Sequence, residues 1–411
     1  MKEILKQSSW LFTAQLLTRI ISFFYTIYLA RILGVSEFGL LTVALAYFSI
    51  ISSVSDLGFN RFLIREIARG KIKIQELIWN IAMLRLTLTS VLFAVFSIFL
   101  YILDPDKMRV SLILLATLAI LPQSIALTFD AVFVGLRKLQ FSAISLLLSG
   151  LATVAIGIFL VSRGLGPTGA INAIIFGQLV YVLVLFFFFL KHEGVTLQSI
   201  KLPILKQTIT GSLPYGLLGI MGLLYFKVDA IILSYFRGSF ETGIYGAAYR
   251  FLEAATFIPY AFFASLFPVL AKAHDLSPAS VKQLYFKSLK IMALLGFILA
   301  AAYFFILPQV IYIFLPDYLL SVGAIKILAF SIPFMFLHTP AVAVLFSTDK
   351  YLKKVLLFSA VILGFNIVVN LIFIPRYGFL AASWITVISE ALSFIVFFLF
   401  TQFQILQRKH Q

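Results

Sequence analysis

The sequence contains no cysteine and few charged residues, and each shortage excludes a class of site or protein. Without cysteine there is no disulfide, no iron–sulfur cluster and no thiolate zinc site. Only 12% of the 411 residues are charged and 62% are hydrophobic, whereas about 25% are charged in an average soluble domain. A water-soluble fold cannot bury that much apolar surface. The composition therefore predicts an all-α integral membrane protein that crosses the bilayer many times.

Motifs of the common enzyme and pump classes are also missing. The sequence has no H-E-x-x-H, no Walker A loop and no G-x-S-x-G elbow. We therefore expect no catalytic residue, no metal site and no cofactor, and ATP-driven transport would need another subunit. The one D-x-D motif, Asp104 and Asp106, is predicted to form a short solvated turn.

Twelve apolar stretches are each long enough to cross a bilayer, which takes about 20 residues. The predicted spans are 8–32, 39–60, 77–102, 110–133, 141–162, 168–190, 208–235, 242–270, 288–314, 320–346, 354–374 and 378–404. The first is too long for a signal peptide and no cleavage pattern ends it, so we expect it to stay attached.

The net charge of +16 comes from 32 Lys and Arg against 16 Asp and Glu. In a soluble protein this excess would suggest a nucleic-acid partner. Here, with the N-terminus placed inside, the cytoplasmic segments carry 21 basic residues, the outer segments six and the spans five. By the positive-inside rule this asymmetry predicts cytoplasmic N- and C-termini and no nucleic-acid partner.

Two sets of recurring residues suggest that the chain contains an internal repeat. The pattern G-x-x-E-x-G occurs at Gly34–Gly39 and again at Gly238–Gly243. Three further residue pairs share one offset: Lys138 with Lys350, Gly166 with Gly378, and Gln178 with Glu390. Coincidence in a low-diversity sequence is the alternative. A parallel repeat predicts a six-helix lobe over 1–190, a cytoplasmic linker over 191–207 and a second lobe over 208–411, with substrate held between the lobes.

Ionisable residues inside spans are costly and usually face a bundle interior or water. Arg19 lies near the middle of its span, where we expect cavity lining, with a buried ion pair as the alternative. Arg250 and Glu253 share a helix face, so they either pair locally or serve as an anion contact with a carboxylate that orients it or takes up a proton. Lys227 and Asp229 point to different faces, so at least one needs a partner on another helix.

The remaining in-span groups allow two interpretations each. Glu390 is an isolated carboxylate, hence a candidate cation or proton site, with a hydrogen bond to a neighbouring helix as the alternative. Asp56 and Asp130 lie near cytoplasmic ends, where solvation at the interface is favoured. Arg85 lies near the inner third of its span, so solvation at the interface and a role inside the bundle are both open for it. Lys326 can snorkel to the outer face. His338, between two prolines, could titrate near neutral pH, but a packing histidine is favoured.

Three stretches carry a family resemblance. The first reads YLARILGVSEFG at 28–39, followed by Gly58 and by REIA at 65–68. The second runs from Asp229 through TGIYGAAYR at 242–250, and the third is PRYG at 375–378 with Ala381, Ala382 and Glu390. In this order they resemble the polysaccharide-transport flippases, the Wzx-type members of the MOP superfamily, which also holds the MATE drug exporters. The lipid II flippases of that superfamily typically have fourteen spans, so the twelve predicted here argue against that branch.

The resemblance implies a V-shaped pair of six-helix lobes that alternate access across the cell membrane. It implies flipping of an undecaprenyl- or other polyprenyl-diphosphate-linked oligosaccharide from the cytoplasmic to the outer leaflet, in polysaccharide biosynthesis. A polysaccharide polymerase and a chain-length regulator are then expected partners. Arginine suits a diphosphate through its bidentate geometry. The expected headgroup contacts are Arg19, Arg250, Lys227 and Arg85, and the expected carriers of a coupling H+ or Na+ are Asp229, Glu253 and Glu390.

Two other functions remain open at this stage. A MATE-like exporter of soluble organic cations would favour an acidic cavity, whereas the spans here hold five basic and five acidic residues. A membrane-embedded glycosyltransferase, ligase or polymerase is disfavoured by the short loops.

Overall fold

The computed structural model describes residues 2–70, 73–194, 196 and 198–407, and within them the chain is helical and contains no strand. Two compact units divide the chain, Met1–Lys227 and Val228–Gln411. The division falls inside helix α8 (Leu202–Ala255), whose first half belongs to the N-terminal unit. The predicted lobe boundaries remain a prediction.

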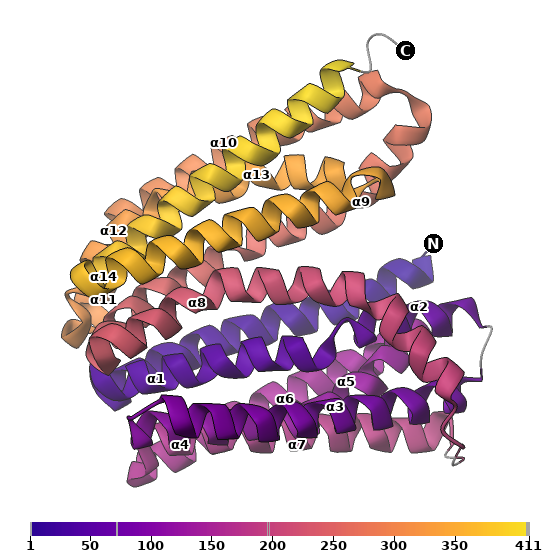
Figure 1. The fold of residues 1–411 in the computed structure, drawn as a ribbon, viewed down its shortest axis with the longest axis horizontal. Helices are drawn as coiled ribbons and strands as arrows, with labels where there is room; N and C mark the ends of the chain where they lie inside the picture. The colour runs from indigo at the N-terminus through magenta and orange to yellow at the C-terminus, as the bar shows by residue number, and fades with distance from the viewer. Residues whose placement is uncertain (1, 71–72, 195, 197, 408–411) are drawn as a thin grey trace. The chain divides into compact units, whose positions relative to one another are not determined.

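The N-terminal unit is a bundle of helices that pack lengthwise on each other (Figure 1). α6 packs along α7 and α1, and α5 lies against α7 and α3. Its helices are α1 (Lys2–Asp56), α2 (Phe59–Arg69), α3 (Ile74–Leu103), α4 (Lys107–Leu118), α5 (Ile120–Gly135), α6 (Leu139–Leu160) and α7 (Gly166–His192), with a π-helical turn at Val161–Leu165.

The C-terminal unit is built around α13 (Ser331–Phe346), which packs against α14 (Leu352–Gln407), α10 (Pro278–Phe305) and α9 (Phe257–Leu276). Two short helices complete it, α11 (Leu307–Phe314) and α12 (Ser321–Ala329), with 3-10 turns at Pro316–Tyr318 and Asp349–Tyr351.

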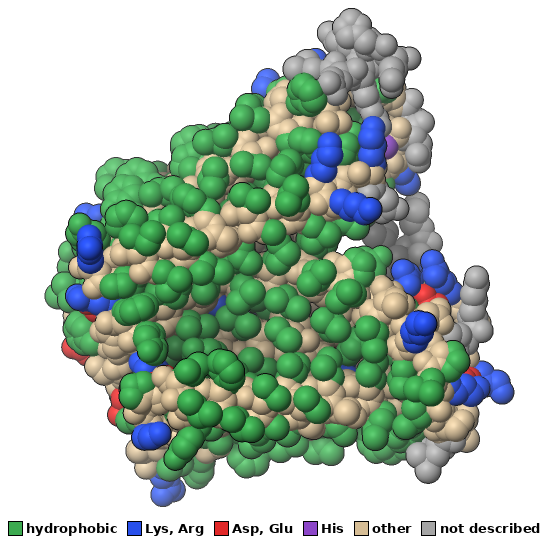
Figure 2. All heavy atoms as spheres, in the orientation of Figure 1, with side chains coloured by type: hydrophobic (Ala, Val, Ile, Leu, Met, Phe, Trp, Pro, Cys, Tyr) green, Lys and Arg blue, Asp and Glu red, His purple; other side chains and the backbone are tan. Residues whose placement is uncertain are grey.

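Eight helical stretches among the described residues are long and apolar enough to cross a membrane. Four of them run for 53 to 73 residues, more than twice the length that one crossing needs. The predicted spans fall on these stretches, apart from the first residues of the spans at 8 and 320, and the number of twelve crossings remains a prediction. Many large apolar side chains are exposed along the helices, while Lys and Arg gather near helix ends (Figure 2). Such a surface suits hydrocarbon rather than water, so the chain is a multi-pass membrane protein.

Paired glycines break the longest helices, and their backbone angles repeat between the two halves. Gly34 has φ 71° and ψ 175°, and Gly238 has φ 81° and ψ −175°. Gly166 and Gly378 match in the same way, with φ 52° and 59° and ψ −142° and −141°. This region of φ and ψ is open essentially only to glycine. The residues that recur in the sequence therefore also share their backbone conformation.

The glutamate of each G-x-x-E-x-G pattern lies against the second glycine break of its own half. Glu37 carboxylate oxygens are the nearest atoms to the free side of Gly166, and those of Glu241 occupy the same place at Gly378. The backbone N–H of Phe379 donates to Glu241 Oε2 at 3.0 Å, and Arg237 holds the same carboxylate at 2.6 Å. A carboxylate at a helix N-terminus satisfies a free N–H and complements the helix dipole. In the second half the pattern thus fastens the helical segment that starts at Gly378, and Glu37 lies in the matching position in the first half.

The predicted linker is tied to the first turns of α3. Gln75 donates to the carbonyl oxygen of Gly194, and Trp79 Nε1 to that of Thr196, both at 2.8 Å. The backbone N–H of Lys201 donates to Asn80 Oδ1 at 2.6 Å. These bonds fix Gly194, Thr196 and Lys201 of the linker against α3.

Candidate functional site

A tight turn between α1 and α2 positions the charged cluster of the N-terminal unit. Leu57 and Gly58 both have positive φ, 44° and 81°, so the helix breaks within two residues. There is no room for a side chain at Gly58, because the backbone of Ser212 on α8 lies against it, and Gly216 fits as closely against Leu57. The first half of α8 therefore packs on this turn, directly beside Asp56.

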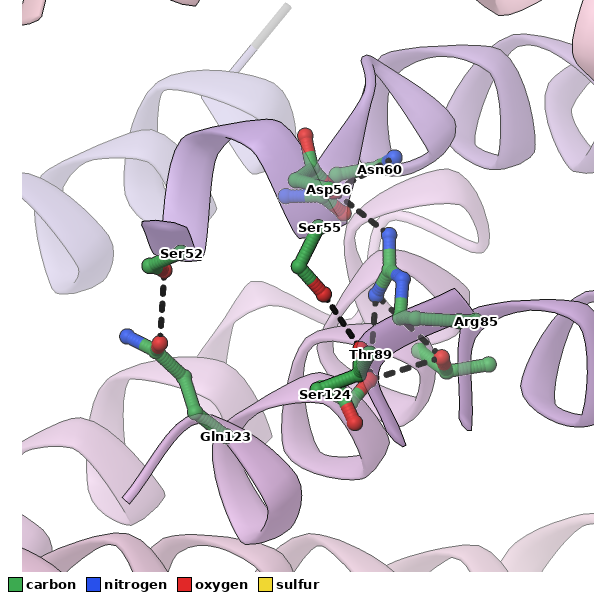
Figure 3. Close-up of polar contacts among 9 residues, drawn as sticks. Ser52, Ser55, Asp56, Asn60, Arg85, Thr89, Gln123 and Ser124 are labelled. Carbon is green, nitrogen blue, oxygen red and sulfur yellow. Dashed lines mark hydrogen bonds and ion pairs between the residues drawn. The ribbon is translucent and has the colours of Figure 1, made fainter. Parts of the chain in front are cut away.

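Arg85 on α3 is the centre of this cluster (Figure 3). Its side chain is 1% exposed and donates to Asp56 Oδ1 at 2.6 Å. It also donates to the Ser124 carbonyl oxygen and to Thr128 Oγ1 on α5, both at 3.2 Å. Its Nε has no hydrogen-bond partner among the described residues. The carboxylate of Asp56 is one-quarter exposed, so the interfacial solvation expected for it is mostly replaced by this ion pair.

Neutral polar side chains close the rest of the cluster. Ser52 donates to Gln123 Oε1 at 2.7 Å, and Ser55 is hydrogen-bonded to Thr89 (Figure 3). The space between them is too narrow for a water molecule. In this arrangement the Arg85 guanidinium is engaged by protein groups, so a contact to a headgroup would require the cluster to open. That predicted role of Arg85 remains a prediction.

In the C-terminal unit, a string of polar groups begins at Asp229, which is 3% exposed. Tyr245 donates its hydroxyl to Asp229 Oδ2, and the same hydroxyl lies 3.3 Å from Thr386 Oγ1 on α14. Tyr245 follows the Gly238 break, so the partner of Asp229 lies on the next helical segment, as the divergent faces of Lys227 and Asp229 predict. Lys227 itself is half-buried.

One turn along α14 from Thr386 lies Glu390, which is 1% exposed. Its Oε2 is 3.3 Å from His338 Nδ1 on α13, so the carboxylate is not isolated as the sequence suggested. Beside it, Asn366 donates to Ser389 Oγ at 3.0 Å, and Asn370 donates to Asn366 Oδ1. Spacing of three and four residues puts Thr386, Ser389 and Glu390 on one face of α14.

The remaining predicted residues differ in their surroundings. Arg250 Nη1 pairs with Glu253 Oε2 at 2.9 Å, and the two side chains are 29% and 25% exposed. The local pair is thus confirmed, and it keeps an open side. Arg19 is exposed on α1. Lys326 is also exposed, with its Nζ 5.5 Å from the centre of the Phe304 ring.

The turn with the D-x-D motif is not simply solvated, contrary to expectation. Asp104 is 6% exposed and receives two hydrogen bonds from Arg109, at 2.6 and 2.7 Å. Asp106 accepts from the backbone N–H of Arg109 and caps α4. Burial alone would raise the pKa of Asp104, but hydrogen bonds from Arg109 and the Asp106 N–H, with the charges of Arg109 and Lys107, lower it overall.

Sequence reasoning did not find the partners that complete these clusters. It singled out neither Tyr245 nor Thr386, and it did not join His338 to Glu390 or Asp56 to Arg85. A usable signal existed in α14, where polar residues recur at helical spacing within apolar surroundings.

Comparison with known proteins places the chain among transporters. A family profile described as "Polysaccharide biosynthesis protein" matches residues 4–274. A search of curated protein sequences gave no significant match.

Solved structures share the fold. An inward-facing multidrug resistance MATE family transporter of the MOP superfamily has a TM-score of 0.74 and 18% identity, over 93% of this chain and 95% of its own. An outward-facing form of such a transporter has a TM-score of 0.63 and 16% identity, over 100% and 97%. A MOP superfamily transporter from Pyrococcus furiosus, described as having a binding pocket of reverse polarity that suggests a different function, has a TM-score of 0.62 and 18% identity, over 100% and 97%. At these identities the likeness concerns the fold, which is that of MOP superfamily transporters.

Proposed function

The chain belongs to the polysaccharide biosynthesis protein family, and we propose that it flips a polyprenyl-diphosphate-linked oligosaccharide from the cytoplasmic to the outer leaflet of the cell membrane. It is a membrane transporter of the MOP superfamily involved in polysaccharide biosynthesis, and its family and fold are those of a transporter rather than an enzyme. The observation that carries the proposal is the family match over 4–274 on a chain with this fold. In such a pathway a polysaccharide polymerase and a chain-length regulator would act on the same product.

The proposed topology has twelve crossings with both termini in the cytoplasm. The excess of basic residues in alternate loops supports this orientation, although the end residues Met1 and Gln411 lie outside those described. The repeated glycine breaks support two related halves. Halves related in this way suit transport by alternating access.

Cations would bind the diphosphate, and the polyprenyl tail would stay in lipid. Arg19 and Arg250 are the best placed of the predicted contacts, because Arg19 is exposed on an apolar helix and the Arg250–Glu253 pair keeps an open side. Arginine can bind a phosphate through two parallel N–H donors. Lys227, which is half-buried and lies two positions before Asp229 on α8, is the next candidate.

An ion gradient would drive the cycle, with H+ or Na+ as the coupling ion and no other cofactor. Asp229, Glu253 and Glu390 are the carboxylates proposed to carry it. Buried carboxylates within helical spans are typical of ion and proton pathways. Asp229 and Glu390 are nearly inaccessible, at 3% and 1% exposure.

Removing the proposed headgroup cations tests this function. We expect Arg19→Ala and Arg250→Ala each to abolish flipping of a polyprenyl-diphosphate sugar in proteoliposomes while the protein is still produced and folded. Lys326→Ala is the matched control, because this exposed cation packs on the Phe304 ring, and it should flip at the wild-type rate. Wild-type activity in both arginine variants would contradict the proposed headgroup contacts.

A second candidate function is export of soluble organic cations, and the fold likeness to MATE transporters favours it. The two functions differ in the charge of the cargo. An organic cation would depend on the buried carboxylates and not on Arg19 or Arg250, so the same arginine variants would export cationic dyes normally.

A further inference from the structure

We infer that His338 and Glu390 form a proton-binding site, in which one proton is shared between imidazole and carboxylate. The inference rests on the proposed function for its role in transport, because it names the coupling ion as a proton and places it on this pair. The physical argument for the site itself needs only the contacts within the C-terminal unit.

The first argument is the contact between two atoms that both carry lone pairs. His338 Nδ1 and Glu390 Oε2 are 3.3 Å apart, and neither atom has a hydrogen-bond partner among the described residues. An ionised carboxylate beside the Nε2–H tautomer of a neutral imidazole would place two lone-pair atoms in contact in a buried place. The Nδ1–H tautomer or a proton on Oε2 removes that repulsion.

The second argument is the cost of charge at this depth. Glu390 is 1% exposed, and among the described residues His338 is its one ion-pair partner. With one proton the pair is neutral overall, either as carboxylic acid and imidazole or as carboxylate and imidazolium. Losing that proton leaves a buried carboxylate, and gaining a second leaves a buried imidazolium, so both changes respond to nearby charge and water.

The third argument is access. The His338 side chain is 24% exposed, whereas Glu390 is enclosed. The imidazole is therefore the member of the pair that an incoming proton would meet first, and transfer from Nδ1 to Oε2 would carry the proton to the carboxylate. One turn away on α14 is Thr386, which contacts Tyr245 and through it Asp229.

Several other titratable groups on the helices of this unit contact residues other than His338 and Glu390. Tyr303 on α10 donates to the Phe251 carbonyl oxygen, and Lys326 on α12 lies over the Phe304 ring. Arg250 and Glu253 on α8 bind each other. Besides His338 and Glu390, the titratable groups among the described side chains of this unit are Asp229, Tyr235, Arg237, Glu241, Tyr245, Tyr249, Arg250 and Glu253 on α8, Tyr260, Lys272 and His274 on α9, Lys282, Tyr285, Lys287, Lys290 and Tyr303 on α10, Tyr312 on α11, Asp317, Tyr318, Lys350 and Tyr351 on the 3-10 turns, Lys326 on α12, and Lys353, Lys354, Arg376 and Tyr377 on α14.

Spectroscopy on the full chain in bilayers tests the site without any transport. The sequence has four histidines, His192, His274, His338 and His410, so nitrogen-15 labelling of histidine gives few signals, and H338Q identifies those of His338. We expect the His338 signals and the protonated-carboxyl infrared band that E390Q removes to change over the same pH interval. In E390Q the His338 interval should shift, while that of His192 stays in place.

An unchanged His338 interval in E390Q overturns the proposal. If E390Q does not fold, E390D replaces it, because a shorter carboxylate separates the two intervals without removing the band. Exchange of K+ for Na+ at constant ionic strength should leave the intervals unchanged, and a shift caused by Na+ would overturn the assignment to a proton.

Flipping rates with and without an imposed pH gradient test the role in transport. The gradient should accelerate flipping by the wild type and give no acceleration in E390Q or H338Q. Equal acceleration in all three proteins overturns the proposal. If the wild type flips no lipid-linked sugar under any condition, the proposed function fails, and the spectroscopic result still decides the proton site.

Discussion

Arg85 shows how a single charge is kept inside an apolar helical unit. An uncompensated arginine in a span costs about 2.5–3.5 kcal/mol on insertion scales. Here Asp56 supplies the opposite charge, and Ser124 and Thr128 accept two further hydrogen bonds. Glu390 uses a weaker partner, an imidazole that is charged only when protonated. The choice of partner separates a fixed ion pair from a group that can exchange a proton.

The Asp56–Arg85 pair can be tested by a double-mutant cycle. Asp56→Asn should cost about 3–5 kcal/mol of unfolding free energy, because it strands the buried charge of Arg85. Arg85→Leu should cost less, because the Asp56 carboxylate that it leaves unpaired is one-quarter exposed. The double variant should cost clearly less than the sum of the two. Unfolding in detergent measures all four proteins, with Lys326→Leu as a nearly neutral control. Strictly additive costs would mean that the two charges do not interact.

Asp104 gives a pH-dependent prediction. Its pKa in the folded protein is lowered, so the ionised carboxylate stabilises the fold at every pH above the unfolded value of about 3.9, and this stabilisation is lost as pH falls through the folded-state pKa. Asp104→Asn should therefore cost about 3 kcal/mol near pH 7, and the difference from the wild type should shrink below about pH 4.

Unfolding measured at neutral and acidic pH checks this expectation. Asp106→Asn is the control, because asparagine caps a helix about as well as aspartate and the buried ion pair is intact. A difference for Asp104→Asn that is the same at both pH values would contradict the assigned pKa shift.

At the scale of helices, glycine decides where the long apolar segments break. Gly34 and Gly238 begin the two G-x-x-E-x-G patterns, and Gly166 and Gly378 receive the glutamates of those patterns. The repeat therefore places a glycine break beside a glutamate carboxylate in each half.

Two alanine substitutions separate backbone strain from side-chain collision. Both Gly34→Ala and Gly378→Ala should cost about 1–3 kcal/mol, because each forces alanine into a glycine-only conformation. Gly378→Ala should cost about 1 kcal/mol more, since its Cβ displaces Glu241 from the Phe379 N–H, whereas Gly34 faces open space.

Thermal unfolding of the two variants in detergent measures the difference. Gly364→Ala is the control, because this glycine has no atom within 4 Å of an added Cβ and alanine favours a helix by about 0.5–1 kcal/mol. Equal costs at Gly34 and Gly378 would show that the Glu241 cap contributes nothing.

The sequence predicts the helices better than it predicts which side chains form ion pairs, and the reason is physical. Apolar length decides where a chain can cross a membrane, so the predicted spans fall on helical stretches. The breaks inside some of them, such as the one between α4 and α5 within 110–133, were not predicted. A pair such as Asp56 and Arg85 joins residues 29 positions apart on different helices, and its formation depends on how the helices pack. The Arg250–Glu253 pair was predictable because it is local, at i and i+3.

At the scale of the whole molecule, composition and family agree on a membrane transporter. The net charge of +16 is concentrated in the loops, while the spans balance five basic against five acidic residues. A cationic headgroup site therefore cannot be read from net charge. The headgroup site that we propose depends on two particular arginines, Arg19 and Arg250.

The most direct test of the proposed cargo is a competition between two substrates in one preparation. Proteoliposomes that contain the purified chain are loaded with a fluorescent polyprenyl-diphosphate sugar, and its arrival in the opposite leaflet is followed by quenching from outside. Efflux of a cationic dye is measured in parallel. The flippase proposal predicts protein-dependent movement of the lipid-linked sugar and no dye efflux above that of empty vesicles. Robust dye efflux without movement of the lipid-linked sugar would contradict it.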